Sequence, residues 1–176
     1  MKKILLLILL LLCYVWCDNS KKITLTKLEG SPPFLNSKIS TASITLGEEN
    51  EYFFSFDISD YQLGAQTINT IENQLANSGK GQHIHLIINN GPYYAKYSNK
   101  FNQKLEKENN VILAFLSRSY HESIKNPNAY FFTKTGKNNK IDLNGEFLFY
   151  SRPKGTYEGE AAKKLLLDFY LINTGL

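Results

Sequence analysis

Two short segments contain all three histidines of the chain. His83 and His85 lie in GQHIHLIINNGPYY (residues 81–94), and His121 lies in AFLSRSYHES (residues 114–123). Side chains two residues apart in a strand lie on the same face, so His83 and His85 form a two-ligand unit for a metal ion. A third imidazole from His121 would complete a His₃ set, and neutral imidazoles favour Cu(II) or Zn(II) over Mg²⁺ or Ca²⁺. The spacing therefore predicts a surface-accessible transition-metal site near the end of a sheet.

Any further ligand of such a site must be an oxygen atom. Met1, Cys13 and Cys17 all lie in the N-terminal segment, so sulfur ligation and a blue-copper centre are excluded for the body of the chain. Glu122 follows His121 directly, and its carboxylate or a water molecule would take the fourth position. The alternative is that the three histidines are ordinary polar residues of a half-buried sheet, with each ring hydrogen-bonded to a carbonyl group or to water.

A second interpretation of the same segments requires no metal. Asparagine, tyrosine and arginine side chains surround the histidines in sequence, and they would form a pocket for a small ligand or a glycan. The residues of this predicted pocket are Asn89, Asn90, Tyr93, Tyr94, Arg118 and Tyr120. Serines also lie near His121, but the chain has no Gly-x-Ser-x-Gly motif, so no catalytic residue is predicted. Binding is favoured over catalysis, and a purely structural or interaction domain is the third alternative.

The elements that would position these residues are predominantly strands. Most segments alternate apolar and polar residues with a period of two, which is typical of half-buried β-strands. The predicted strands span residues 22–28, 51–59, 82–89, 111–119, 129–135, 145–151 and 162–173. Ile68, Ile71 and Leu75 instead have helical spacing, which predicts a short helix over residues 66–77.

Composition and length predict one ordered domain. The chain has 176 residues, of which 43% are hydrophobic and 13% aromatic, and this is enough for a substantial core. Seven short strands with one minor helix predict an all-β fold, an antiparallel β-sandwich of immunoglobulin-like or cupredoxin-like form, with a barrel as the alternative. We expect this single domain to span residues 23–176.

The N-terminal segment has the layout of an export signal. Residues 1–17, MKKILLLILLLLCYVWC, begin with two lysines and continue with an apolar run that is too short for a membrane-spanning helix. The segment ends at Cys17, which has no partner for an internal disulfide, and we expect this cysteine to be lipidated after processing; Cys13 is the alternative processing site. Residues 18–22 would then tether an exported protein to a membrane, in the periplasm or at the outer membrane.

The charge of the chain argues against a nucleic acid as its partner. The formal net charge of +4 includes Lys2 and Lys3, which leave with the signal, and the remaining charges alternate in sign along loops. The membrane, reached through the lipid anchor, is the one predicted partner, and the residues do not identify a protein partner.

The segments GQHIHLIINNGPYYAKY, LAFLSRSYHESIKN and SRPKGTYEGEAAKKLLLDFYLIN resemble a family of exported Bacteroidetes proteins, often lipoproteins, that carry the label "phosphopeptide-binding protein". More distantly, the histidine strand is similar to that of a periplasmic domain of unknown function with a GHHHLLID-like strand. The resemblance covers most of residues 50–173 and implies a small exported β-domain in which the two histidine segments are paired. The chain itself has two arginines and no glycine-rich loop that opens a helix, so its residues give little support to phosphate recognition.

Overall fold

The computed structural model describes residues 23–26, 30–68, 76–137 and 140–175. In this part of the chain there are nine strands and two short 3₁₀ segments. The strands are β1 (Lys38–Leu46), β2 (Glu51–Ser59), β3 (His83–Ile88), β4 (Tyr94–Lys96), β5 (Lys100–Lys104), β6 (Asn110–Ser117), β7 (Tyr130–Thr135), β8 (Phe147–Arg152) and β9 (Asp168–Ile172). The 3₁₀ segments are η1 (Glu48–Asn50) and η2 (Gly159–Lys163).

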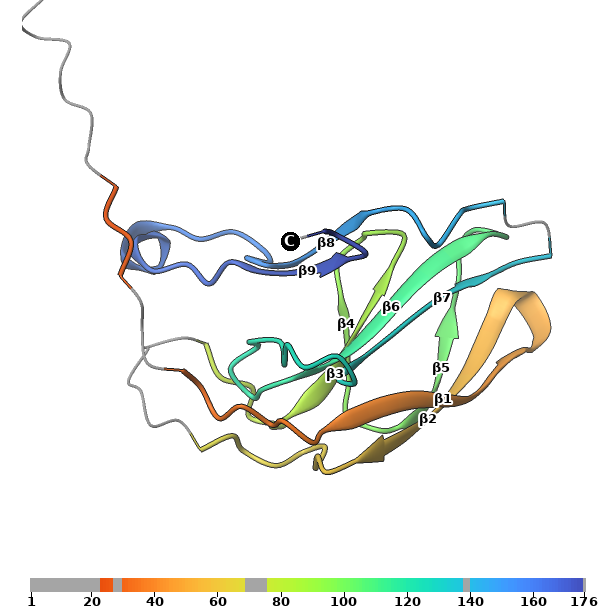
Figure 1. Cartoon of the computed structure of the whole chain (residues 1–176), viewed down its shortest axis with the longest axis horizontal. Coiled ribbons are helices and arrows are strands. Elements are labelled where there is room, and N and C mark those ends of the chain that lie inside the picture. The colour runs from red at the N-terminus through yellow and green to blue at the C-terminus, as the bar shows by residue number, and fades with distance from the viewer. Residues whose placement is uncertain (1–22, 27–29, 69–75, 138–139, 176) are drawn as a thin grey trace, which may run out of the picture.

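The strands form three antiparallel sheets that lie in layers. The outer sheet has the order β1-β2-β5, the central sheet has the order β4-β3-β6-β7, and β8 and β9 form a two-stranded hairpin. Figure 1 shows the hairpin on one side of the central sheet, with β1 and β2 on the opposite side. The predicted all-β fold, an antiparallel β-sandwich, is confirmed, and the hairpin adds a third layer to it.

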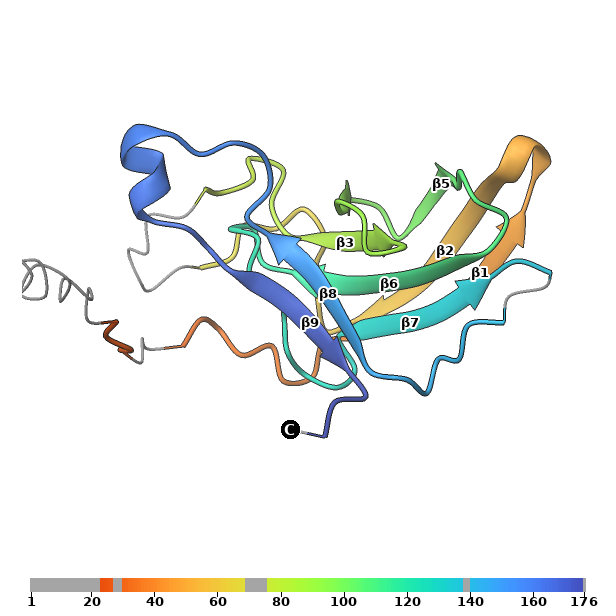
Figure 2. The same ribbon diagram turned by 90° about the horizontal axis from the view of Figure 1, so that it is seen from above.

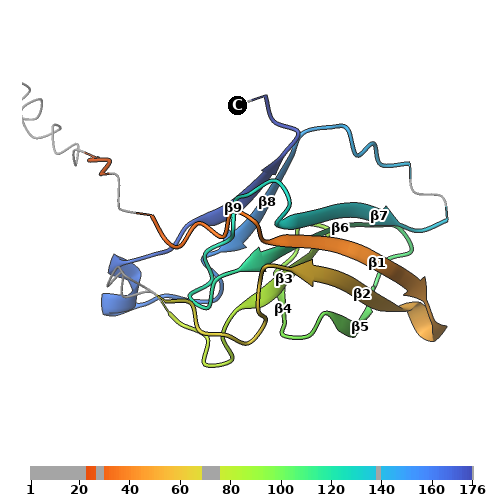
Figure 3. The same ribbon diagram turned by 60° about the horizontal axis from the view of Figure 1, so that its bottom comes forward.

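The first core lies between the outer sheet and the central sheet. Phe54 and Phe56 alternate along β2 and are fully buried, and they face Ile84 and Leu86 of β3 in the same hydrophobic cluster. Period-two alternation produces this arrangement, because every second side chain of each strand points to the same side. Figure 3 shows β1 beside β7. Near the start of β1, the Ile39 amide donates a hydrogen bond to the carbonyl of Asn128, in the loop before β7, at 2.9 Å. The two sheets are thus connected along this side of the sandwich.

A second core lies on the other face of the central sheet. Ile87 and Phe115 are fully buried there and belong to one cluster with Phe149 of β8 and Tyr170 of β9. In Figure 2 the hairpin crosses the strands of the central sheet at an angle. Because both faces of this sheet are covered, all eight residues of β6 are buried. The face of β3 that carries the histidines is therefore covered by the hairpin.

Several predicted elements differ from the structure. The predicted strand over residues 22–28 is wrong for residues 23–26, which have no regular structure, and β1 begins at Lys38 instead. Of the predicted strand over 162–173, only β9 is a strand, and η2 precedes it. The predicted helix over 66–77 is not observed at residues 66–68 or 76–77, and its centre lies outside the described residues.

The predicted signal (residues 1–17), its two cysteines Cys13 and Cys17, and the tether over residues 18–22 also lie outside the described residues. Within the part of the chain that the structure describes, no helix has the length and apolar character needed to cross a membrane.

Candidate metal centre

Strand β3 places two histidines on the face that meets the hairpin. His83 pairs with Ser117 of β6 and His85 pairs with Phe115, so their side chains leave the central sheet on the same side. Both residues are fully buried. The expectation that this face of the strand is solvent-accessible is wrong, because the hairpin and the segments around it cover the two imidazoles.

The turn after β6 places the third histidine. The amide of Arg118 donates to the Glu122 carbonyl and the amide of His121 donates to the Arg118 carbonyl, each at 2.9 Å. This tight turn holds His121 at φ = 68°, in the left-handed region that non-glycine residues seldom adopt. Such backbone strain is concentrated at functional sites, since the surrounding structure must stabilise it. The turn directs the imidazole back toward β3, where its ring centroid lies 5.0 Å from that of His83.

The three imidazoles converge at one point. Nε2 of His83 lies 2.9 Å from Nε2 of His85, and the nitrogens that His83, His85 and His121 offer all lie within 4.8 Å of one another. Ligand nitrogens about 2.0–2.1 Å from a tetrahedral ion lie roughly 3–3.5 Å apart. The sequence-based prediction that His83, His85 and His121 come together is confirmed, and small side-chain adjustments would bring them to ligand spacing.

Backbone and side-chain partners fix the tautomer of at least one ring. Nδ1 of His83 lies 2.8 Å from the Gly81 carbonyl, which only accepts hydrogen bonds, so Nδ1 carries the proton and Nε2 presents a lone pair. Nδ1 of His85 lies 3.0 Å from Oγ of Ser151, which can donate or accept. Without a metal, Nε2–H of His85 donates to His83. In the other tautomer of His85, Nδ1–H would donate to Ser151 and both Nε2 atoms would be free to bind a metal ion.

Aromatic side chains enclose the histidines. The ring of Tyr93 stacks on His85 with centroids 3.7 Å apart and an interplanar angle of 9°, and its hydroxyl lies 3.5 Å from Nδ1 of His121. The ring of Tyr97 lies 5.0 Å from His83. These contacts limit rotation of the His83 and His85 rings.

Burial and nearby cations keep the three imidazoles neutral. Burial is the main cause that lowers the pKa of His83 and holds the pKa of His85 well below 6.5, and neighbouring histidines and Arg152 add to the shift of His85. For His121, burial first, and then the neighbouring Arg152, His83 and Lys154 in that order, lower the pKa to about 3. Neutral imidazole is the form that binds metals. The protein therefore keeps these ligands available at pH values where free imidazole is already protonated.

These shifts predict that the metal-free protein loses stability as the pH falls from about 6.5 to 5. The unfolded chain binds protons at its histidines near pH 6.5, whereas the folded chain resists protonation until lower pH. The unfolded state is thus favoured progressively across this interval, which lies above the ordinary titration range of carboxyl groups. Urea unfolding at several pH values measures the slope. In His121→Gln, which cannot titrate, we expect a shallower slope, and an identical slope in both proteins would contradict the prediction.

Two basic residues outside the predicted metal site and ligand pocket lie near the histidines. Arg152 ends β8 and its guanidinium lies 5.3 Å from the centroid of Tyr93. Lys154 lies 4.4 Å from the same ring, and Nζ donates to the Tyr93 carbonyl at 3.0 Å. Both charges oppose protonation of His85 and His121. The sequence signal for them is the SRPK segment at the end of a strand, but only the packing of the hairpin brings it to the histidines.

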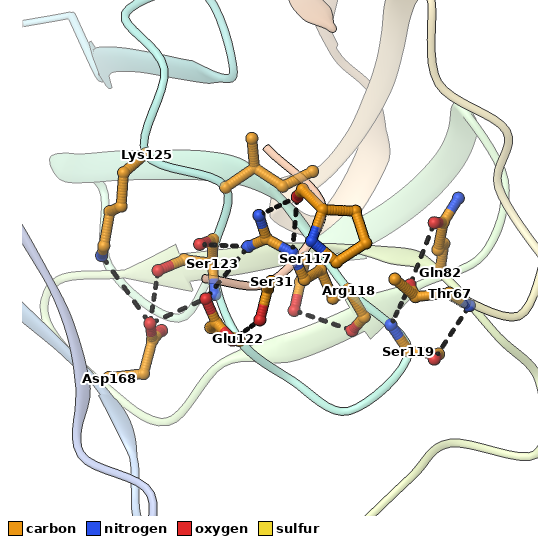
Figure 4. Close-up of polar contacts among 12 residues, drawn as sticks. Ser31, Thr67, Gln82, Ser117, Arg118, Ser119, Glu122, Ser123, Lys125 and Asp168 are labelled. Carbon is orange, nitrogen blue, oxygen red and sulfur yellow. Dashed lines mark hydrogen bonds and ion pairs between the residues drawn. The ribbon is translucent and has the colours of Figure 1, made fainter. Parts of the chain in front are cut away.

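Glu122 and Arg118 belong to a neighbouring polar cluster, shown in Figure 4. One carboxylate oxygen of Glu122 accepts from Nη1 of Arg118 at 3.3 Å, and the other accepts from the Ser31 hydroxyl at 2.5 Å. Arg118 also donates to the carbonyls of Pro32 and Ser123. Among the described residues, the group of converging metal-ligand atoms consists of the three histidines without Glu122. The carboxylate that the sequence offered as a fourth ligand is thus engaged elsewhere.

The other residues of the predicted ligand pocket do not gather in one place. Tyr93 lies at the histidines, whereas Asn89 and Tyr94 line a separate groove of about 340 Å³ at the opposite end of β3. The side chain of Asn89 holds that turn by accepting from the Val111 amide, and Asn90 accepts from the Tyr150 amide. The buried ring of Tyr120 lies next to His121 in sequence and lines the cleft beside it.

Comparisons of the chain with protein-family models, with curated proteins and with solved structures find no match.

Proposed function

We propose that this protein is an accessory or binding protein of the cell envelope that binds one Cu(II) or Zn(II) ion through His83, His85 and His121. The observation that supports it most is the 2.9 Å separation of the two Nε2 atoms in a fully buried pair, with the third imidazole directed at the same point. The cell-envelope location is inferred from residues 1–17 and the lipid anchor at Cys17.

The surroundings of the histidines favour metal binding over a purely structural role. Burying a polar ring costs free energy unless each nitrogen is satisfied, and an apolar side chain would fill the same position at lower cost. Here three imidazoles are buried or half-buried together and kept neutral. The Gly81 carbonyl and the Ser151 hydroxyl are hydrogen-bond partners of Nδ1 of His83 and Nδ1 of His85, which leaves Nε2 of each ring for the metal. Metal-bound histidines usually have such a partner on the nitrogen that does not bind the metal.

The same geometry supports binding more than catalysis. Three protein ligands leave a coordination position for an exogenous group, as catalytic zinc sites do. A hydrolytic metal site also needs a general base, and the carboxylate nearest in sequence, that of Glu122, is held by Arg118 and Ser31. We therefore assign the site to binding or transfer of the metal.

The direct test is calorimetric titration of the chelator-stripped protein with Cu(II), Zn(II) and, as a control, Mg²⁺. We expect one Cu(II) or Zn(II) ion per chain with a Kd tighter than about 1 μM, which corresponds to more than about 8 kcal/mol, and no binding of Mg²⁺, which prefers oxygen ligands. Weak binding of several ions per chain, as scattered surface side chains produce, would reject the proposal.

A further inference from the structure

A small cleft opens beside the histidines on the side of His121. It has a volume of about 50 Å³, and His121, Arg152, Tyr157 and Lys164 line it. His83 and His85 are fully buried, whereas His121 is half-buried. The cleft is therefore the side from which a second ligand would approach an ion held by the three imidazoles.

Arg152 lies in the wall of this cleft with an unused hydrogen-bond donor. Its side chain is 9% exposed, and its buried Nε–H has no hydrogen-bond partner within the described part of the chain. The carboxylate of its cross-strand neighbour Asp168 uses one oxygen, which accepts from the Ser123 amide at 3.2 Å and lies 3.7 Å from Nζ of Lys125. Its other oxygen, Oδ2, also has no hydrogen-bond partner among the described residues. A buried donor without a partner costs about 1–3 kcal/mol, so its presence needs an explanation beyond packing.

The charges around the histidines are unbalanced. Arg152 and Lys154 are positive, and the three imidazoles are neutral. The nearby carboxylates are both paired with other cations, Glu122 with Arg118 and Asp168 with Lys125. A divalent ion bound to the histidines would add two further positive charges with no anionic ligand from the chain. Since like charges repel one another, a negative charge from outside the chain would stabilise the occupied site.

We propose that a small oxyanion, of carbonate or phosphate size, binds in this cleft between Arg152 and the metal ion and completes the coordination of that ion. This inference rests on the metal binding proposed above. The guanidinium of Arg152, which lines the cleft, would donate hydrogen bonds to the anion, and Lys154 would contribute a second positive charge. The volume of about 50 Å³ restricts the ligand to a few atoms, since pockets for larger organic ligands measure about 300–1,000 Å³.

The test measures phosphate binding to the Cu(II)-loaded protein by calorimetry and by paramagnetic broadening of the phosphorus resonance. We expect phosphate to bind with its resonance broadened by the copper. In Arg152→Gln and in Lys154→Gln we expect the phosphate affinity to fall about tenfold or more, with Cu(II) still bound. Lys154 is exposed, so its substitution reports on the cleft even if Arg152→Gln fails to fold. Lys100→Gln, an exposed position on β5 of the outer sheet, is the matched control and should be unchanged.

The outcomes separate the two proposals. If the protein binds Cu(II) but phosphate binding is absent, or is equal in the wild type and in both variants, the oxyanion site is rejected and the metal site stands. If Cu(II) does not bind, the proposed function is rejected. The metal-free protein can then still bind phosphate in a way that depends on Arg152, and this result would support the anion cleft without the metal. If the metal-free protein binds neither Cu(II) nor phosphate, both proposals are rejected.

Discussion

Replacing His121 with alanine is expected to lower the affinity of the protein for Cu(II) and Zn(II) by about 1,000-fold, or about 4 kcal/mol. The substitution removes one of three ligands, and loss of even an outer hydrogen-bonding partner of a ligand costs about 10–100-fold. His121 is the suitable position for this test because it lies on a turn and is half-buried, so its removal leaves the two cores unchanged. Calorimetric titration of the chelator-stripped variant measures the change.

The same loss is expected for His83→Ala and His85→Ala, since Nε2 of each ring faces the common point. These rings are fully buried, so far-UV circular dichroism must first show that each variant keeps its strand structure. Glu122→Gln is the matched control. It removes a charge next to His121 in sequence, but the carboxylate is bound by Arg118 and Ser31 and does not face the common point. Its metal affinity should equal that of the wild type. Equal affinity in all four variants would instead return the histidines to a structural role.

The histidine constellation could be predicted from the sequence because it depends on a local rule. A spacing of two residues in a strand places His83 and His85 on one face whatever the rest of the fold is. His121 follows an apolar segment, and it comes close to His83 and His85 if that segment pairs with the strand that carries them. The structure meets this condition, since β3 and β6 are antiparallel neighbours with His83 opposite Ser117.

The covering of the site could not be predicted, because it depends on contacts between distant segments. Residues Ser151, Arg152 and Lys154 are more than sixty positions from His85 along the chain, and only the docking of the β8–β9 hairpin on the central sheet brings them together. In the sequence, the His83 side of β3 is more polar than its other side, and such a side usually faces water. The third layer reverses this expectation and buries both imidazoles.

The errors in the strand assignment have a similar origin. The pattern of residues 22–28 is as regular as that of a strand, but residues 23–26 pair with no neighbour and have no regular structure. Strand β1, with the sequence KISTASITL, has few apolar residues, so its pattern does not predict a strand. Its strand structure depends on pairing with β2 from Lys38 to Leu46, interrupted by a bulge between Thr41 and Ser43. β-structure is set by such pairing more than by intrinsic preference.

The chain's two arginines are expected to differ in how much stability is lost when their charge is removed. Arg118 is buried, and its guanidinium donates to the carbonyls of Pro32 and Ser123 and pairs with Glu122 (Figure 4). Arg118→Met would leave these acceptors unsatisfied and the carboxylate unpaired. Because each buried acceptor left without a partner costs about 1–3 kcal/mol, and Glu122 is only half-buried, we expect the free energy of unfolding to fall by about 2–5 kcal/mol in urea titrations.

Arg152→Gln is the matched comparison, and its free energy of unfolding should stay within about 1 kcal/mol of the wild-type value. The contact of the Arg152 guanidinium with the Tyr93 ring at 5.3 Å is desolvated and worth about 2 kcal/mol. Its loss is offset by removal of the buried Nε–H, which has no hydrogen-bond partner among the described residues and costs about 1–3 kcal/mol. Equal losses of stability in the two variants would contradict this division. Arg152 is buried near three imidazoles and contributes little to stability, so we infer that it is there to bind a ligand. Arg118, in contrast, stabilises the turn that contains Glu122 and Ser123.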